Sequence, residues 1–208
     1  MTRARAAGRK GALPGEVRII GGHWKRSKLP VAAKPGLRPT MDRVRETLFN
    51  WLGQDLNGWR CLDAFAGTGA LGFEAASRGA AQVVLLERDA ALASALRATQ
   101  QRLQATQVRI EVTDALAWMS RCAPSCFDLV LLDPPFDAGL AQAALTTAAP
   151  LVVSGGFIYV ESNEACGDDI VRNLGLTRYR SARAGSVHFE LLQQQAAVTT
   201  SPTSTSSS

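Results

Sequence analysis

The sequence lacks several features that would place it in other classes of protein. Its 208 residues contain no stretch of about 18 uninterrupted apolar residues, the length that a membrane span needs. The first residues, Met1 to Arg5, lack the apolar run of a secretory signal. We therefore expect a cytoplasmic protein with no membrane partner.

Metal-ligating side chains are also scarce. The chain has four cysteines without a Cys-x-x-Cys pair, and its two histidines, His23 and His188, lie far from them in sequence. Cys122 and Cys126 have a spacing that could recruit zinc, but no second pair of ligands accompanies them. The sequence predicts reduced thiols and no metal.

Basic residues are concentrated in the first 45 positions. This segment holds 12 of the 23 lysines and arginines and two acids, Glu16 and Asp42, so its net charge is 12 − 2 = +10. The remainder has 11 basic and 16 acidic residues, or 11 − 16 = −5. A basic segment on an acidic domain is typical of polyanion binding, because phosphate contacts release condensed counterions. For residues 3–10 alone, a disordered, solubilising arm is an equally good explanation.

Two kinds of pattern follow one another along the chain. Residues 17–31 read as two short extended runs around a Gly21-Gly22 turn, with mostly cationic polar positions. An amphipathic helix follows, from an N-cap at Thr40 to Gly53. Short apolar runs then alternate with helical segments. The strand candidates are 62–65, 83–86, 108–112, 129–132 and 157–160, and the helix candidates are 71–78, 90–103, 115–121 and 140–149.

This alternation predicts an α/β fold with a doubly wound, mostly parallel sheet, helices on both faces, and ligands at the carboxyl ends of the strands. Two further runs, 176–180 and 187–192, flank a Gly185-Ser186 turn and predict a terminal antiparallel hairpin. The Ser/Thr-rich end of the chain is expected to be disordered.

A glycine-rich segment follows the first strand of this pattern. Asp63-Ala-Phe-Ala-Gly67-Thr-Gly69-Ala-Leu-Gly72 would open a helix and let backbone amides approach a ligand closely. The string also satisfies Gly-x-Gly-x-x-Gly, and Glu87 stands where a nicotinamide-dependent enzyme keeps its ribose-binding acid. The motif alone therefore leaves the cofactor open.

Three acids end consecutive predicted strands, namely Asp63, Glu87 and Asp114. An array of acids suits S-adenosylmethionine, which carries an ammonium group and no phosphate, better than a dinucleotide. Glu87 could accept the ribose hydroxyls, Asp114 an adenine amino hydrogen, and Asp63 would lie near the amino-acid end. For Asp114, a helix N-cap is the competing explanation. The predicted cofactor residues are Asp63, Phe65, Gly67, Thr68, Gly69, Glu87, Arg88, Asp114 and Ala115.

The reacting site is predicted at Asp133-Pro134-Pro135-Phe136, directly after a buried strand. The prolines stiffen the backbone, so the Asp133 carboxylate and the Pro134 carbonyl are fixed acceptors for the hydrogens of an exocyclic amine. Phe136 offers a face on which an unpaired base can stack. The chemistry is then mainly alignment of the amine with a sulfonium methyl.

These motifs resemble a known family. The Asp-Pro-Pro-Phe quartet and the glycine-rich loop look like those of class I amino-methyltransferases. Segments 17–25, 28–30, 37–52 and 63–72 together resemble the bacterial small-subunit rRNA guanine-N2 methyltransferases of the RsmD family, over roughly residues 16–192. The resemblance implies a Rossmann-like, seven-stranded S-adenosylmethionine-dependent enzyme that methylates one guanine of 16S rRNA in an assembled or nearly assembled 30S particle.

The expected organisation is a basic arm over 1–15, an RNA-contacting hairpin and helix over 16–53, a Rossmann-like methyltransferase domain over 54–193, and a disordered tail over 194–208. The predicted RNA-contacting residues are Arg18, His23, Trp24, Lys25, Arg26, Lys28, Arg38, Arg43 and Arg45. We expect a monomer.

Three other functions are compatible with parts of the pattern. A DNA adenine-N6 methyltransferase uses the same quartet, but 208 residues leave little room for a target-recognition domain. A nicotinamide oxidoreductase would need a hydride-transfer constellation, which the sequence does not supply. A non-catalytic RNA-binding module would leave the acids at the strand ends unexplained.

Overall fold

A computed structural model of the chain describes residues 16–31, 42–135 and 139–195. The elements, in chain order, are β1 (Glu16–Arg18), β2 (Lys28–Pro30), α1 (Asp42–Trp51), β3 (Arg60–Asp63), α2 (Ala70–Ser77), β4 (Gln82–Glu87), α3 (Ala90–Leu103), β5 (Val108–Val112), α4 (Ala115–Met119), β6 (Phe127–Leu132), α5 (Leu140–Ala148), the 3-10 helix η1 (Ala149–Leu151), β7 (Val152–Ser162), α6 (Asp168–Asn173), β8 (Leu176–Ala184) and β9 (Val187–Gln194). No helix in this part of the chain combines the length and apolar character required to cross a membrane.

Seven strands form one sheet in the order β5-β4-β3-β6-β7-β9-β8. The strands from β5 to β7 pair in parallel, whereas β9 lies antiparallel between β7 and β8. The predicted mostly parallel sheet and the terminal hairpin are confirmed. The chain order reverses between β3 and β6, which is the switch point where sheets of this kind bind ligands at their carboxyl ends.

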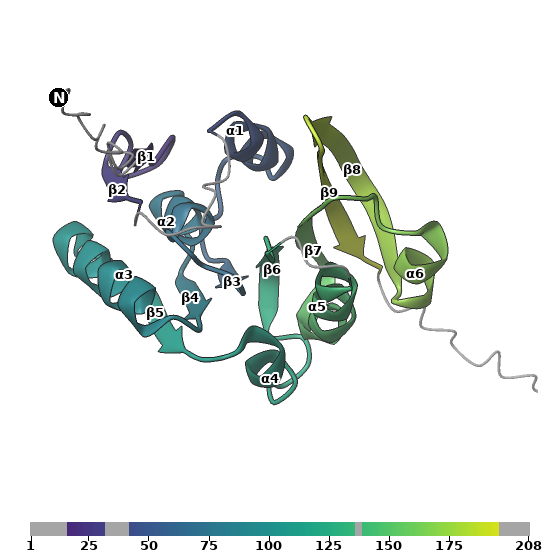
Figure 1. The fold of residues 1–208 in the computed structure, drawn as a ribbon. Coiled ribbons are helices and arrows are strands. Elements are labelled where there is room, and N and C mark those ends of the chain that lie inside the picture. The colour runs from purple at the N-terminus through teal and green to yellow at the C-terminus, as the bar shows by residue number, and fades with distance from the viewer. Residues whose placement is uncertain (1–15, 32–41, 136–138, 196–208) are drawn as a thin grey trace, which may run out of the picture.

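The sheet is buried on both faces because its strands alternate side chains between two apolar clusters. Leu85 and Leu131 belong to the cluster that contains α1, α2, α3 and the β1–β2 hairpin, whereas Leu86 and Val130 belong to the cluster that contains α4, α5 and α6. Figure 1 shows α2 and α3 on the opposite side of the sheet from α4 and α5. Helices on both faces are therefore confirmed.

The amino-terminal elements pack into the first of these clusters. Val17 and Leu29 of the hairpin and Leu48 of α1 are buried with sheet residues. At the end of α1, the ring of Trp51 stacks on Phe189 of β9 with 5.4 Å between centroids. The hairpin and α1 thus rest on the same core as the sheet.

The amino-terminal hairpin and the segment after β7 differ from the sequence-based expectation in more than their bounds. The hairpin does not turn at Gly21-Gly22, because β1 ends at Arg18 and β2 begins at Lys28, so residues 19–27 form a longer loop. Helix α6 was not predicted at all. It has six residues, of which only Val171 is buried, so its sequence carries almost no apolar periodicity.

Candidate active site

The glycine-rich segment forms the turn between β3 and α2. Gly67 and Gly69 have φ values of 50° and 76°, in the left-handed region that favours glycine. A Cβ atom on Gly72 would lie 2.1 Å from a methyl group of Leu85, so a side chain cannot fit between helix and sheet. These positions therefore need glycine for backbone conformation and for close packing of the helix against the sheet.

Glu87, at the end of β4, holds this turn in place. One carboxylate oxygen accepts the Gly67 N–H at 3.0 Å, and the other accepts the Asp89 N–H at 2.8 Å. Each carboxylate oxygen can accept a further hydrogen bond. These two hydrogen bonds fix the turn. Because Glu87 is only half-buried, its side chain is also accessible to solvent.

Asp63, at the end of β3, is almost completely buried, with 1% of its surface exposed. Its Oδ2 accepts the Gly72 N–H at 3.0 Å, while its Oδ1 has no hydrogen-bond partner among the described residues. Burial raises the pKa of this carboxyl to about 7, with further repulsion from Asp133 and Glu87, against the lowering effect of the Gly72 and Phe65 backbone amides. A buried acceptor without a donor suits a cationic or N–H-bearing ligand group.

Asp114 is the N-cap of α4, which was the competing explanation for this residue. Its Oδ1 accepts the Ala117 N–H at 2.9 Å. Its cap role does not exclude ligand binding, because the side chain is exposed and has a second oxygen. The other predicted cofactor residues lie around the same strand ends: Phe65 and Thr68 are half-buried, Ala115 is buried, and Arg88 is exposed.

The segment from Asp133 to Pro135 follows β6, the strand that pairs with β3. Leu131 is the partner of Asp63 in this pairing, so Asp133 lies just beyond the end of β3. Its charge is close enough to raise the pKa of Asp63. Asp133 is half-buried, Pro134 is buried and Pro135 is exposed. Phe136 and Arg38 lie outside the described residues.

A further acid at the same edge was missed. Glu161 is 5% exposed near the end of β7 and accepts the Tyr159 hydroxyl hydrogen at 2.7 Å. Burial, followed by the charges of Glu161 and Asp133, raises the pKa of Tyr159 well above its ordinary value. The rule that found Glu87, which directly follows the predicted strand 83–86, also applies to Glu161, which directly follows the predicted strand 157–160.

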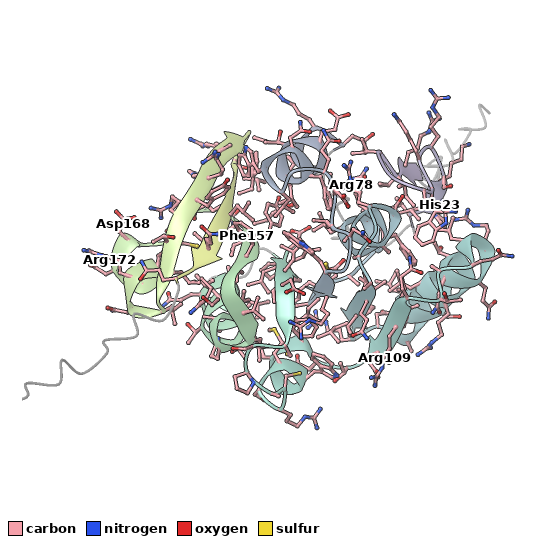
Figure 2. All side chains as sticks on the ribbon, turned by 180° about the vertical axis from the view of Figure 1, so that it is seen from behind. His23, Arg78, Arg109, Phe157, Asp168 and Arg172 are labelled. Carbon is pink, nitrogen blue, oxygen red and sulfur yellow. The ribbon has the colours of Figure 1, made fainter. Side chains whose placement is uncertain are left out.

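The cationic hairpin residues have the predicted exposure in most cases. The side chains of Arg18, His23, Lys25, Arg26, Lys28 and Arg43 are exposed, and Trp24 is half-buried. Figure 2 shows His23 on the hairpin and Arg78 between the hairpin and α1. The exposed cations leave this surface accessible to a polyanion.

The prediction that Arg45 contacts RNA is wrong. Its side chain is 0% exposed, and its guanidinium donates to Asp42 at 2.6 Å and to the Arg18 carbonyl at 2.8 Å, with Glu74 at 3.5 Å. The buried face of α1 is wider than its apolar stripe because both the hairpin and α2 pack against it. Arg45 is thus an internal residue that joins these elements.

Across residues 16–31, 42–135 and 139–195, no three histidine, cysteine or acidic side chains are grouped as metal ligands. The four cysteines are free thiols.

Three features define a Rossmann-like class I methyltransferase fold. The strand order places one antiparallel strand next to the edge of the sheet. A glycine-rich turn follows the central strand, and acids stand at the strand ends. The family described as Conserved hypothetical protein 95 matches residues 17–193, so the chain belongs to this family.

Known proteins support the same assignment. The chain is 40% identical over 185 residues to the Ribosomal RNA small subunit methyltransferase D of Escherichia coli, covering 88% of this chain and 92% of the relative. The solved structure of the Escherichia coli yhhF protein is 35% identical, with a TM-score of 0.75 over 87% of this chain and 99% of that one. A magnesium protoporphyrin IX methyltransferase from Synechocystis with bound SAM is 16% identical and shares the fold, with a TM-score of 0.60 over 74% and 79% of the two chains. The family resemblance predicted from the sequence is confirmed.

Proposed function

We propose that this protein transfers a methyl group from S-adenosylmethionine to the exocyclic N2 of one guanine in small-subunit rRNA. The observation that carries the proposal is the position of Asp133 and Pro134, directly beyond the strand end where Asp63 presents an unpartnered oxygen. The name of the 40% identical relative supports rRNA as the substrate. The protein acts as a cytoplasmic monomer on 30S subunits or late assembly intermediates.

The residues at the strand ends fit S-adenosylmethionine, which supplies an electrophilic methyl group when bound. Asp63 accepts from the ammonium group, and this contact satisfies its buried Oδ1. Glu87 accepts from the ribose hydroxyls with the lone pairs that Gly67 and Asp89 leave available. Asp114 accepts from the adenine amino group. The other contacts come from Phe65, Thr68, Gly69, Arg88 and Ala115.

The chain's own contribution to the reaction is alignment. The Asp133 carboxylate and the Pro134 carbonyl each accept one hydrogen of the guanine amine. The nitrogen of that amine then presents its electron pair to the methyl group, which a delocalised amine does poorly in solution. Pro135 stiffens the loop, and Phe136 stacks on the base. The N–CH3 bond would form as the S–CH3 bond breaks, with S-adenosylhomocysteine as the leaving group, and the amine would lose a proton to water during or after transfer.

The cationic hairpin binds RNA phosphates. Arg18, Lys25, Arg26 and Lys28 make the main phosphate contacts, with His23 and Trp24 from the same loop and Arg43 from α1. Arg38, which lies outside the described residues, is a further proposed contact. These contacts carry no sequence information directly, so they supply affinity and orientation.

The test is transfer of labelled methyl to 30S particles, free 16S rRNA and duplex DNA from cells that lack the protein, followed by nucleoside analysis. We expect label in N2-methylguanosine from RNA. Label in N6-methyladenine from DNA would retain the fold and cofactor but replace the substrate. The absence of transfer to any of them, with no binding of S-adenosylhomocysteine, would favour a non-catalytic RNA-binding module.

A further inference from the structure

The loop that joins β1 to β2 is fastened to the carboxyl-terminal half of α2. The Glu74 carboxylate accepts the backbone N–H groups of Ile20 at 2.7 Å and Gly21 at 2.8 Å. One turn further on, the Ser77 hydroxyl accepts the Trp24 N–H at 2.9 Å and donates to the Gly21 carbonyl at 2.6 Å. Phosphate binding by exposed cations does not by itself require hydrogen bonds between the loop backbone and side chains of α2.

Glu74 itself is completely buried, and two arginines neutralise it. The Arg78 guanidinium lies at 2.8 Å and the Arg45 guanidinium at 3.5 Å from its oxygens, and all three side chains are 5% exposed or less. Removing one member of a buried ion network leaves an uncompensated charge, which is strongly destabilising. The loop amides of Ile20 and Gly21 therefore bind a carboxylate whose own position is fixed by two arginines.

The glycine pair in the loop is explained by this contact. A Cβ atom on Gly22 would lie 1.8 Å from the Ser77 carbonyl oxygen, and one on Gly21 would lie 2.4 Å from the Arg78 guanidinium. The backbone N–H of His23 also donates to the Ser77 carbonyl at 2.7 Å. The two glycines allow the loop backbone to touch the helix directly, rather than forming a two-residue turn.

Helix α2 connects this contact to the cofactor site. It has eight residues, a length of about 12 Å, and its first turn bears Gly72, whose N–H binds Asp63. The second strand of the hairpin is held separately, because Arg102 of α3 donates to the Lys28 carbonyl at 2.6 Å. The backbone that carries the hairpin cations is thus attached at two points to the helices that flank the glycine-rich turn.

We infer that Glu74 and Ser77 are positioning residues for the RNA substrate. They hold the hairpin at one distance from the methyl donor, so the phosphates bound by the hairpin determine which guanine reaches Asp133. This inference rests on the proposed function. The alternative is that the hairpin moves to close over RNA, in which case the loop would leave α2 during the reaction cycle.

The first variant is Gly22→Ala, with Gly58→Ala as its matched control. Both glycines have positive φ values, 71° and 82°, but a Cβ atom on Gly58 meets nothing within 4 Å. The two substitutions therefore share the backbone strain, and only Gly22→Ala forces the loop off the helix. With 30S particles as substrate, we expect Gly22→Ala to raise KM about tenfold through loss of several hydrogen bonds. We expect kcat and S-adenosylhomocysteine affinity to match those of Gly58→Ala, and some label at other guanines.

A second pair of variants protects the test against misfolding. Ser77→Ala removes the hydroxyl from a helix in which alanine is well tolerated, and Ser94→Ala makes the same change on the exposed face of α3. We expect KM to rise about fivefold in the first variant and not in the second. A loss of fold would lower the melting temperature and kcat together, whereas a positioning role changes KM and the site of methylation.

Amide hydrogen exchange completes the experiment and separates the two proposals. We expect the amides of Ile20, Gly21, His23 and Trp24 to be protected in the free protein and to lose protection in Gly22→Ala. Rapid exchange in the wild-type protein would overturn the inference. The inference would also be overturned if the loop amides of Gly22→Ala exchange rapidly while its KM and its methylated product remain those of the wild-type protein. Failure of the wild-type protein to methylate guanine would instead overturn the proposed function, whatever the exchange pattern.

Discussion

Replacing Asp63 by asparagine separates two consequences of burying a carboxylate at the end of β3, namely its effect on protein stability and its effect on cofactor affinity. The substitution keeps the size of the side chain and an acceptor for the Gly72 N–H, but removes the charge. In the wild-type protein, burial raises the pKa of this carboxyl from 3.8 to about 7. The ionised form is therefore costly in the unliganded protein and useful when a cation is bound.

The sign of the effect on stability follows from this direction. A carboxyl whose pKa is higher in the folded protein favours the folded state at low pH, and this advantage is lost as the pH rises from the unfolded pKa to the folded one. The difference of about three units corresponds to roughly 4 kcal/mol at most. We expect Asp63→Asn to recover part of this free energy of unfolding above pH 7 and to raise the melting temperature there.

Cofactor affinity should rise with pH, whereas the stability contribution of Asp63 falls with pH. If the Asp63 carboxylate binds the ammonium group, lowering the pH from about 7.5 to about 6 should weaken S-adenosylhomocysteine binding roughly eightfold, because the carboxyl must lose its proton first. Isothermal titration calorimetry measures this dependence. In Asp63→Asn, the affinity should be lower at pH 7.5 and nearly independent of pH.

The control is Asp55→Asn, which removes an equal charge from an exposed position. It should bind S-adenosylhomocysteine as the wild-type protein does at every pH. An affinity that does not change with pH in the wild-type protein, or the same slope in Asp63→Asn, would refute the assigned role of Asp63.

Three further predictions concern the reacting group, the RNA surface and the fold. Asp133→Ala should lower kcat by about 100-fold or more while S-adenosylhomocysteine affinity, measured by calorimetry, stays within about twofold of wild type. Replacing Arg18, Lys25 and Arg26 together by alanine should reduce the slope of log affinity against log salt concentration by about two to three in an RNA filter-binding assay. Arg45→Ala should reduce the free energy of unfolding in urea by about 3–5 kcal/mol, because Glu74 is left buried without one of its cations.

Each of these predictions has an outcome that would contradict it. Wild-type activity in Asp133→Ala would exclude its role as the acceptor for the amine, and an unchanged salt slope would show that phosphates bind elsewhere. Arg43→Ala, on the exposed face of the same helix, is the control for Arg45→Ala and should change the free energy of unfolding by about 0.5 kcal/mol or less. Equal destabilisation by the two variants would contradict the buried network.

Much of the sheet could be predicted because local patterns dictate it. The strand from Val108 to Val112 and the helix from Ala90 to Leu103 have the predicted bounds, since strand alternation and helical periodicity are properties of neighbouring residues. The acids Asp63 and Glu87 could be placed at one edge, because parallel strands present their carboxyl ends together. Helix α6 could not be predicted, because Val171 is its only buried residue and one apolar position gives no helical periodicity.

The sequence by itself determined the fold class, the glycine-rich turn and the position of the Asp133-Pro134 segment, because each depends on backbone preferences and strand periodicity. Only the tertiary structure decided what the charged residues do. Arg45 and Arg43 are two positions apart on one helix, yet Glu74 and the hairpin bury the first and leave the second exposed. The burial of a charge depends on which distant segments pack against it, and a pattern of neighbouring residues does not contain that information.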